Sequence, residues 1–191
     1  MSDQKISRYP VPDVNDLPED IKQIILNIQE KSGFIPNVFL TLAHRPDEFR
    51  AFMAYHDALL ERDSNLTKAE KEMIIVATSN DNNCQYCVVA HGAILRIRAK
   101  NPLIADQIAV NYRKADITAK QKSMIEFAMK VSNNSRAIGD EDFETLRSHG
   151  FTDEDIWDIA VITAFFGLSN RMANFTSMRP NDEFFAMARG I

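Results

Sequence analysis

The sequence predicts an all-α fold. Glycine and proline are scarce, with 6 and 7 among 191 residues, and good helix formers are abundant. Apolar residues recur at spacings of three and four along most of the chain, and no segment alternates as a strand does. Hydrophobic residues make up 45% and charged residues 26%, which is ordinary for a globular protein. We therefore expect an N-terminal arm over residues 1–15 and a single helical domain over 16–191.

The first elements follow from proline positions and isoleucine spacing. Pro10 and Pro12, among few apolar side chains, predict an extended arm unless the segment docks on a partner. A capped amphipathic helix follows, with Pro18 before its start and Gly33 after its end. Its apolar stripe at i, i+3, i+4 and i+7 consists of Ile21, Ile24, Ile25 and Ile28.

The remaining helices are expected between turn and capping signals. A short helix over 37–44 is ended by Arg45-Pro46, and the helical period restarts at Phe49 and continues to Leu60. A polar tail marked by Pro180 should close the chain. Further helices are expected at 67–79, 83–100, 103–113, 118–134, 140–148 and 152–176.

Three helix starts echo one another. They read Leu66-Thr67-x-x-Glu70, Ile117-Thr118-x-x-Gln121 and Phe151-Thr152-x-x-Asp155. Each places a Thr N-cap after an apolar residue, and the first two complete a capping box. Convergent capping chemistry and a degenerate internal repeat of helical hairpins both explain the echo. Because only the first copy is followed by cysteines and a histidine, the chemistry should lie there.

Charge and composition exclude several function classes. The net charge is −5, from 22 Lys+Arg and 27 Asp+Glu, and no long basic run is present, so we expect no nucleic-acid partner. The longest nearly apolar run, Ile159 to Leu168, is about half of a membrane span, and Met1 to Lys5 lack an apolar signal region. The protein is therefore expected to be cytoplasmic, without a membrane partner.

The two cysteines open a helix beside a histidine. The turn-forming segment 79–83 is followed directly by Cys84-Gln85-Tyr86-Cys87, and His91 comes four residues after the second cysteine. Peptide N–H groups and the helix dipole at a helix start lower the pKa of a cysteine from its reference of about 8.5. His91 lies on the same face as Cys87, so it can exchange protons with that thiol.

The position of the turn brings in Glu72. The midpoint of residues 72 and 91 lies in the Asn-rich turn, so the two side chains should lie at the same depth of a helical hairpin. Glu72 borders the apolar stripe that contains Met73, and a partly buried carboxylate needs a partner. The pattern predicts a Glu–His–Cys relay in which the imidazole accepts the thiol proton directly or through a water.

Other interpretations of these residues are open. The cysteines could simply pack, and Glu72 could be a solvated side chain paired with Lys68. Cys-x-x-Cys-x3-His could bind zinc with Glu72 or His56 as fourth ligand, but structural zinc sites usually draw ligand pairs from separate segments and no second pair exists. We therefore predict neither a metal nor a cofactor.

Further candidates are weaker. His56 lies beside an apolar stripe and is either a core-edge residue or part of the pocket. Tyr86 either packs or bonds a peroxide or sulfenate oxygen. Trp157 is expected in the core or a subunit interface, and Phe165-Phe166 in the core.

The motif resembles that of a known family. Glu72, eleven residues, Cys84-x-x-Cys87, three residues and His91 resemble the signature of AhpD-like alkylhydroperoxidases, of the carboxymuconolactone decarboxylase-like superfamily. The likeness is clearest from about Phe49 to Ala99. The chain length, the residues of the motif and the C-terminal tail are most similar to those of the uncharacterised peroxidase-related branch. The resemblance implies an AhpD-like helical bundle and homo-oligomers, commonly trimers or hexamers.

The resemblance also implies a peroxidase mechanism. Cys87 would attack a hydroperoxide after Glu72, through water and His91, removes its proton, and the product is a sulfenic acid. Cys84 would then close a disulfide that an external dithiol or protein reductant reduces. The residues alone leave the order of the cysteines open, because Cys84 is nearer the dipole and Cys87 nearer the histidine. The chain departs from the family pattern at Tyr86, where a relay histidine often stands.

Two other function classes compete with a peroxidase. A carboxymuconolactone decarboxylase-type enzyme would not need the cysteine pair, whereas a redox sensor would use the disulfide once, without turnover. Self-association is expected on physical grounds as well, because the arm, the helix around Trp157 and Phe165-Phe166 offer more apolar surface than the fold needs.

Overall fold

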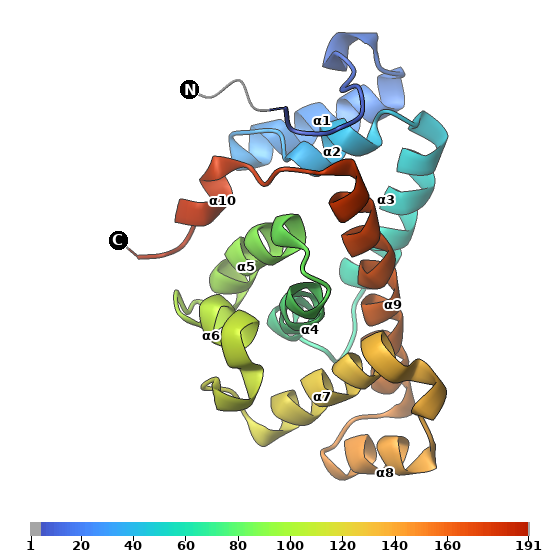
Figure 1. The fold of residues 1–191 in the computed structure, drawn as a ribbon, viewed down its shortest axis with the longest axis vertical. Coiled ribbons are helices and arrows are strands. Elements are labelled where there is room, and N and C mark those ends of the chain that lie inside the picture. Colours follow the sequence, from blue (N-terminus) through green and yellow to red (C-terminus); the bar gives the residue numbers. More distant parts are fainter. Residues whose placement is uncertain (1–4, 191) are drawn as a thin grey trace.

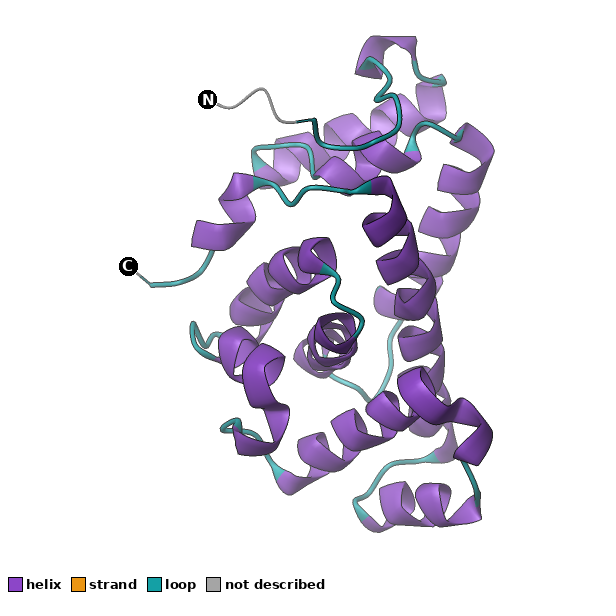
Figure 2. Cartoon of the chain, viewed as in Figure 1, coloured by secondary structure: helices purple, strands orange, loops and turns teal. Residues whose placement is uncertain are grey.

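The computed structural model describes residues 5–190, and within that range it contains helices and no strands (Figure 2). The all-α prediction is confirmed. The helices are α1 (Glu19–Ser32), α2 (Asn37–Leu42), α3 (Pro46–Leu60), α4 (Lys68–Asp81), α5 (Gln85–Ala99), α6 (Ile104–Asn111), α7 (Ala119–Asn134), α8 (Asp140–Ser148), α9 (Asp153–Thr176) and α10 (Asp182–Ala186). Short 3₁₀ turns lie at Val14–Asp16, Tyr112–Lys114 and Ser135–Ala137.

The core is built around α4. Figure 1 shows this helix end-on at the centre of the lower part of the molecule, surrounded by α5, α6, α7 and α9, all of which contact it. Every residue from Lys71 to Ser79 is buried. A helix enclosed on all sides buries its polar residues together with its apolar ones. Glu72 is therefore inside the protein because its helix is central.

The three echoing helix starts all form capping boxes. Each Thr hydroxyl accepts the N–H of the third helical residue, whose side chain accepts the Thr N–H in return; the helices are α4, α7 and α9. These helices contact one another, and Gln121 Nε2 donates to Glu70 Oε1 at 3.3 Å, so two of the caps are joined. The capping prediction is confirmed, and the duplication of a helical hairpin stays a prediction.

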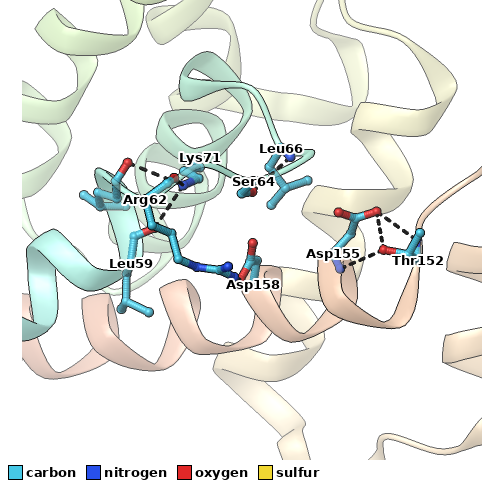
Figure 3. A network of polar contacts seen from close by, with 9 residues as sticks. Leu59, Arg62, Ser64, Leu66, Lys71, Thr152, Asp155 and Asp158 are labelled. Atoms are coloured by element: carbon cyan, nitrogen blue, oxygen red, sulfur yellow. Dashed lines mark hydrogen bonds and ion pairs between the residues drawn. The ribbon is translucent and has the colours of Figure 1, made fainter.

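A buried lysine fixes the entry to α4 (Figure 3). Lys71 is 3% exposed, and its Nζ donates to the carbonyls of Leu59, Leu60 and Arg62 at 3.0, 3.4 and 3.1 Å. Burial lowers the pKa of this ammonium. The Arg62 guanidinium pairs with Asp158 of α9. The end of α3 is thus tied to α4 and α9 beside Glu72.

Lys71→Met should lower the free energy of unfolding by about 1–3 kcal/mol, because it leaves three carbonyls at the end of α3 without their donor. Denaturant unfolding measures the change. Lys68→Met is the matched control, since its ammonium is half exposed and pairs only with Glu61 at the surface. Equal losses in both variants would contradict the structural role of Lys71.

The N-terminal arm packs on the chain's own C-terminal segment. The Arg8 N–H donates to the Thr176 carbonyl at 2.7 Å, and the Arg179 N–H donates to the Ile6 carbonyl at 3.0 Å. Residues 5–13 contain no helix, as expected, but the arm is already turning at 14–16. Residues 1–4 of the expected arm lie outside the described residues. The N-terminal arm therefore docks on its own chain and does not need a partner chain for this contact.

Two expectations about the C-terminal third are corrected. The polar tail expected near Pro180 contains the short helix α10, whose Phe184 side chain is buried against the body of the protein. Phe165-Phe166 was counted as apolar surface for association, but both rings are buried, which agrees with the core expectation. Trp157 is 65% exposed and is therefore not a core residue. Within residues 5–190, no helix combines the length and apolarity that crossing a bilayer requires.

Candidate active site

A tight turn joins α4 to α5 and places Cys84 at the start of α5. Asn83 has φ 52°, in the left-handed region that Asn tolerates better than most residues. The Cys84 N–H donates to the Ser79 carbonyl at 2.9 Å, which closes the turn. Cys84 is the N-cap residue of α5, so the expected helix start at 83 falls two residues later, at Gln85.

The structure brings Glu72 and His91 together across this hairpin. Glu72 Oε2 lies 2.8 Å from His91 Nδ1, and the two side chains are only 10% and 13% exposed. The turn position predicted this pairing. An ionised Glu72 accepts from Nδ1–H, which leaves Nε2 as the basic nitrogen of the ring. The edge-to-face contact between His91 and Phe166, with centroids 4.7 Å apart, fixes the ring plane.

A small cavity of about 100 Å³ opens on this pair. His56 lines it together with Glu72 and His91, so the residue lies at the pocket as well as at the edge of the core. Its Nδ1 lies 2.9 Å from Asp57 Oδ1. Within residues 5–190, no three His, Cys, Asp or Glu side chains converge as metal ligands would. Because Glu72 and His91 both line the cavity, water in it can reach the pair.

The two cysteines are buried, and both are free thiols. The Cys87 N–H donates to Cys84 Sγ at 3.3 Å, which is the N-cap bond of α5. Cys87 Sγ lies 3.9 Å from Ser169 Oγ of α9. Cys84 borders a surface depression of about 230 Å³, shared with Gln85 and Val88. Both cysteines are nonetheless buried, with Cys84 0% and Cys87 2% exposed.

Negative charge is best held on Cys84. The Cys87 thiol donates to the Cys84 sulfur and lowers the pKa of Cys84 to about 7, with further help from the Cys87 N–H and Asn170. The same hydrogen bond, together with burial, raises the pKa of Cys87. Above about pH 7 the reduced pair therefore carries one proton, which is held on Cys87 because its pKa is the raised one.

Alkylation of Cys84 should accelerate as the pH rises, with a midpoint near 7 rather than the ordinary value of about 8.5. The reason is that only the thiolate reacts, and Cys84 loses its proton near that pH. Mass spectrometry of the Cys84 peptide after timed iodoacetamide treatment gives the profile. Cys87→Ala should move the midpoint upward because it removes the donating thiol. An ordinary midpoint in the wild type would contradict the charge assignment.

Polar residues of α9 complete the site, and sequence reasoning missed them. Asn170 is fully buried; its Nδ2 donates to Ser79 Oγ at 2.9 Å and its Oδ1 accepts from Asn82 Nδ2 at 3.0 Å. Neither Asn170 nor Ser169 was singled out as a site residue. The available signal was the pair of polar residues directly after the apolar run that ends at Leu168, since buried polar groups in such a helix need partners.

Tyr86 lies in the same buried cluster as the two cysteines. Its side chain is buried, and its hydroxyl accepts from the Val38 N–H of α2 at 3.2 Å. Burial raises the pKa of this phenol. This contact shows that Tyr86 packs between α2 and α5, and a hydrogen bond from its hydroxyl to a peroxide or sulfenate oxygen stays a prediction.

Known proteins share this fold. Residues 46–109 match the carboxymuconolactone decarboxylase family. An uncharacterised peroxidase-related protein from Ralstonia eutropha JMP134, described as an alkylhydroperoxidase AhpD core, is 68% identical, with 97% of this chain and 98% of that chain covered and a TM-score of 0.97. An uncharacterised peroxidase-related protein from Silicibacter sp. TM1040 is 39% identical, with 99% and 100% covered and a TM-score of 0.93.

A less similar structure aligns with part of this chain. An Agrobacterium tumefaciens protein of unknown function, named as an AhpD antioxidant defence protein, is 25% identical, with 71% of this chain and 92% of that chain covered and a TM-score of 0.63. No curated protein matches the sequence. On the strength of the two peroxidase-related structures, the chain belongs to the AhpD-like family of peroxidase-related proteins.

Proposed function

We propose that this protein is a thiol-dependent peroxidase that reduces hydroperoxides through Cys84 and Cys87. The observation that carries the proposal is the 2.8 Å distance between Glu72 Oε2 and His91 Nδ1. His91 lies one turn after Cys87 on α5, the helix that Cys84 caps. A base of this kind beside a thiol pair suits proton transfer during thiol oxidation. The names of the two peroxidase-related proteins reported above support the same reaction class.

The first step is attack of a thiolate on the hydroperoxide. The Cys84 sulfur attacks the terminal oxygen, the O–O bond breaks, and the leaving alkoxide takes up one proton and departs as an alcohol. Cys84 becomes a sulfenic acid, oxidised by two electrons, and the hydroperoxide is reduced by two. Cys84 suits this role because its pKa of about 7 makes it the resting thiolate and because it borders the surface depression.

The second step closes the disulfide and uses the relay. The Cys87 thiol transfers its proton to His91 Nε2 through a bridging water, and Glu72 stabilises the imidazolium that forms. The Cys87 sulfur then attacks the Cys84 sulfur and expels hydroxide, which takes the proton and leaves as water. The relay is needed here because burial and the neighbouring thiolate raise the pKa of Cys87.

An external dithiol completes the cycle. One of its sulfurs attacks the disulfide at Cys84, the residue of the pair that lines the depression, and its second sulfur resolves the mixed disulfide. The dithiol is oxidised to a disulfide, and both protein thiols are restored. The overall reaction converts one hydroperoxide and one dithiol into an alcohol, water and an oxidised dithiol.

This order of the two cysteines is the reverse of the order that the family resemblance implies. The resemblance assigns attack to Cys87, whereas the hydrogen bonds at the start of α5 favour charge on Cys84. The relay acts on the Cys87 proton in both schemes. The two schemes therefore differ in which step the relay accelerates, and this difference can be measured.

Steady-state turnover tests the proposed function. Purified protein is mixed with cumene hydroperoxide or hydrogen peroxide and with dihydrolipoamide or a thioredoxin-type reductant, and peroxide loss is followed. We expect many turnovers per chain with at least one dithiol. A single equivalent of peroxide consumed, with no recycling by any dithiol, would contradict a peroxidase and favour a redox sensor.

We also propose that the protein forms homo-oligomers. Trp157 and Leu168 are exposed on one face of α9, and Val161 and Ala164 continue the stripe between them. Trp157→Asp should weaken association without unfolding the chain, because its side chain is already mostly in water. Light scattering at micromolar concentration should give a trimer or a hexamer for the wild type, and a monomer would overturn the expectation.

A further inference from the structure

Two asparagines of α9 hold the turn that joins α4 to α5. Asn82 Nδ2 donates to Asn170 Oδ1 at 3.0 Å, and Asn174 Nδ2 donates to the Asn82 carbonyl at 3.1 Å. Asn170 and Asn174 are four positions apart and therefore lie on the same face of α9. Asn170 is fully buried, whereas Asn174 is exposed. Of the two, only Asn170 contacts the turn from inside the protein.

The orientation of the Asn170 amide is fixed by its partners. Its Oδ1 accepts from Asn82, and its Nδ2 donates to Ser79 Oγ at 2.9 Å. An amide nitrogen carries two hydrogens, and Ser79 takes one of them. The second belongs to a side chain that is 0% exposed, so bulk water does not reach it. Because a buried N–H without an acceptor is costly, the second hydrogen needs an acceptor inside the site.

The two sulfurs are the acceptors that surround this amide. The Ser79 carbonyl accepts the Cys84 N–H at 2.9 Å, and Ser169 Oγ, one residue before Asn170, lies 3.9 Å from Cys87 Sγ. Hydrogen bonds from the Cys87 thiol, the Cys87 N–H and Asn170 together lower the pKa of Cys84 to about 7. At Cys87 the hydrogen bond to Cys84 and burial raise the pKa, and Asn170 opposes them.

The other donors at the site each serve one sulfur. The Cys87 N–H and the Cys87 thiol donate to Cys84, and the thiol stops doing so when its proton leaves in the proposed second step. Ser169 lies against Cys87. The amide of Asn170 keeps both hydrogens throughout. It can therefore donate to Cys84 before that step and to Cys87 during it.

We propose that Asn170 is the fixed hydrogen-bond donor to both reacting sulfurs. Its second amide N–H stabilises the Cys84 thiolate in the reduced protein and the Cys87 thiolate while the disulfide closes. The role at Cys87 rests on the proposed peroxidase function, whereas the role at Cys84 concerns the reduced protein alone. His91 and Tyr86, the titratable side chains whose charges act with those of the sulfurs, belong to α5, and α9 supplies the uncharged donor.

The pH profile of Cys84 alkylation tests the role at Cys84. Asn170→Ala should raise the midpoint from about 7 by roughly 1–2 pH units, the usual effect of losing a hydrogen bond to a charged group. Asn174→Ala is the matched control, because it makes the same change one turn along α9 and also removes a contact with the turn. Its midpoint should stay near 7. No shift in Asn170→Ala, or equal shifts in both variants, would overturn the proposal.

A measurement on the unmodified chain keeps the proposal testable if Asn170→Ala does not fold. In ¹⁵N-labelled reduced protein, a side-chain N–H signal of Asn170 should shift with pH and with the same midpoint as Cys84 alkylation, because it bonds the group that titrates. The side-chain signals of Asn174 should stay in place over that range. An Asn170 signal that does not follow the titration of Cys84 would contradict the proposal.

Trapping with dimedone tests the role at Cys87. After one equivalent of hydroperoxide, the Cys84 sulfenic acid should last roughly 10-fold longer in Asn170→Ala than in Asn174→Ala, because the Cys87 thiolate forms less readily without its donor. Equal lifetimes would overturn this role. Failure of the proposed function is distinguishable, since the wild type would then form no sulfenic acid while the alkylation midpoints still differed.

Discussion

Glu72→Gln should slow formation of the Cys84–Cys87 disulfide by roughly 10²- to 10⁴-fold, the usual contribution of a general base. The neutral amide cannot stabilise an imidazolium at His91 as the carboxylate 2.8 Å away does. Sulfenic acid formation at Cys84 should stay within a few-fold of the wild type, because the Cys84 thiolate is present without the relay. Quenched-flow trapping with dimedone, followed by mass spectrometry, measures both steps.

The variant His91→Ala should show the same defect, and combining it with Glu72→Gln should add little, because the two side chains act as one unit. Glu61→Gln is the matched control, since Glu61 lines the same cavity but pairs with Lys68. Additive losses would mean that the carboxylate and the imidazole act separately. Slower sulfenic acid formation in Glu72→Gln would instead favour attack by Cys87.

The cysteine variants should abolish steady-state turnover for different reasons. Cys84→Ser removes the attacking thiolate, so no sulfenic acid should form, although serine is a strong N-cap and keeps the start of α5 intact. Cys87→Ser keeps the attacking sulfur and lacks the resolving one, so a sulfenic acid should accumulate at Cys84. Trapping with dimedone in each variant reads out the difference. Rapid trapping at Cys87 in Cys84→Ser would show that the order implied by the family resemblance is the correct one.

Much of the fold was predictable because its signals are local. The capping box at Thr67 depends on Glu70 three residues later, and a spacing of three or four apolar residues marks a helix wherever it occurs. The Glu72–His91 pair was also within reach, because a tight turn between two helices relates residues at equal distances from it. These inferences use one hairpin and need no knowledge of distant segments.

The rest of the site depends on packing between segments far apart in the sequence. Asn170 is opposite Ser79 only because α9 crosses the α4–α5 turn, and no local pattern encodes that crossing. The docking of the arm on Thr176 is of the same kind. Pattern alone also placed Phe165-Phe166 both in the core and at an interface, and only the packing of α9 decides for the core.

The order of the cysteines was open for a related reason. Proximity to the helix start and proximity to the histidine are both readable from sequence, but they favour different sulfurs. The decision depends on which sulfur accepts the hydrogen bonds, and the structure gives that role to Cys84. The sequence signals for Cys84 and Cys87 are balanced. The two residues are distinguished by the 3.3 Å bond from the Cys87 N–H to Cys84 Sγ and by the Cys87 thiol that donates to the same sulfur.

One measurement tests the central claim most directly. Reduced protein is mixed with one equivalent of cumene hydroperoxide per chain, and the peptide that carries both cysteines is followed by mass spectrometry from milliseconds to minutes. The account predicts a transient sulfenic acid on Cys84, then an intramolecular Cys84–Cys87 disulfide, with one cumyl alcohol released per chain. Two unreacted thiols after the full time course, or disulfides only between chains, would contradict it.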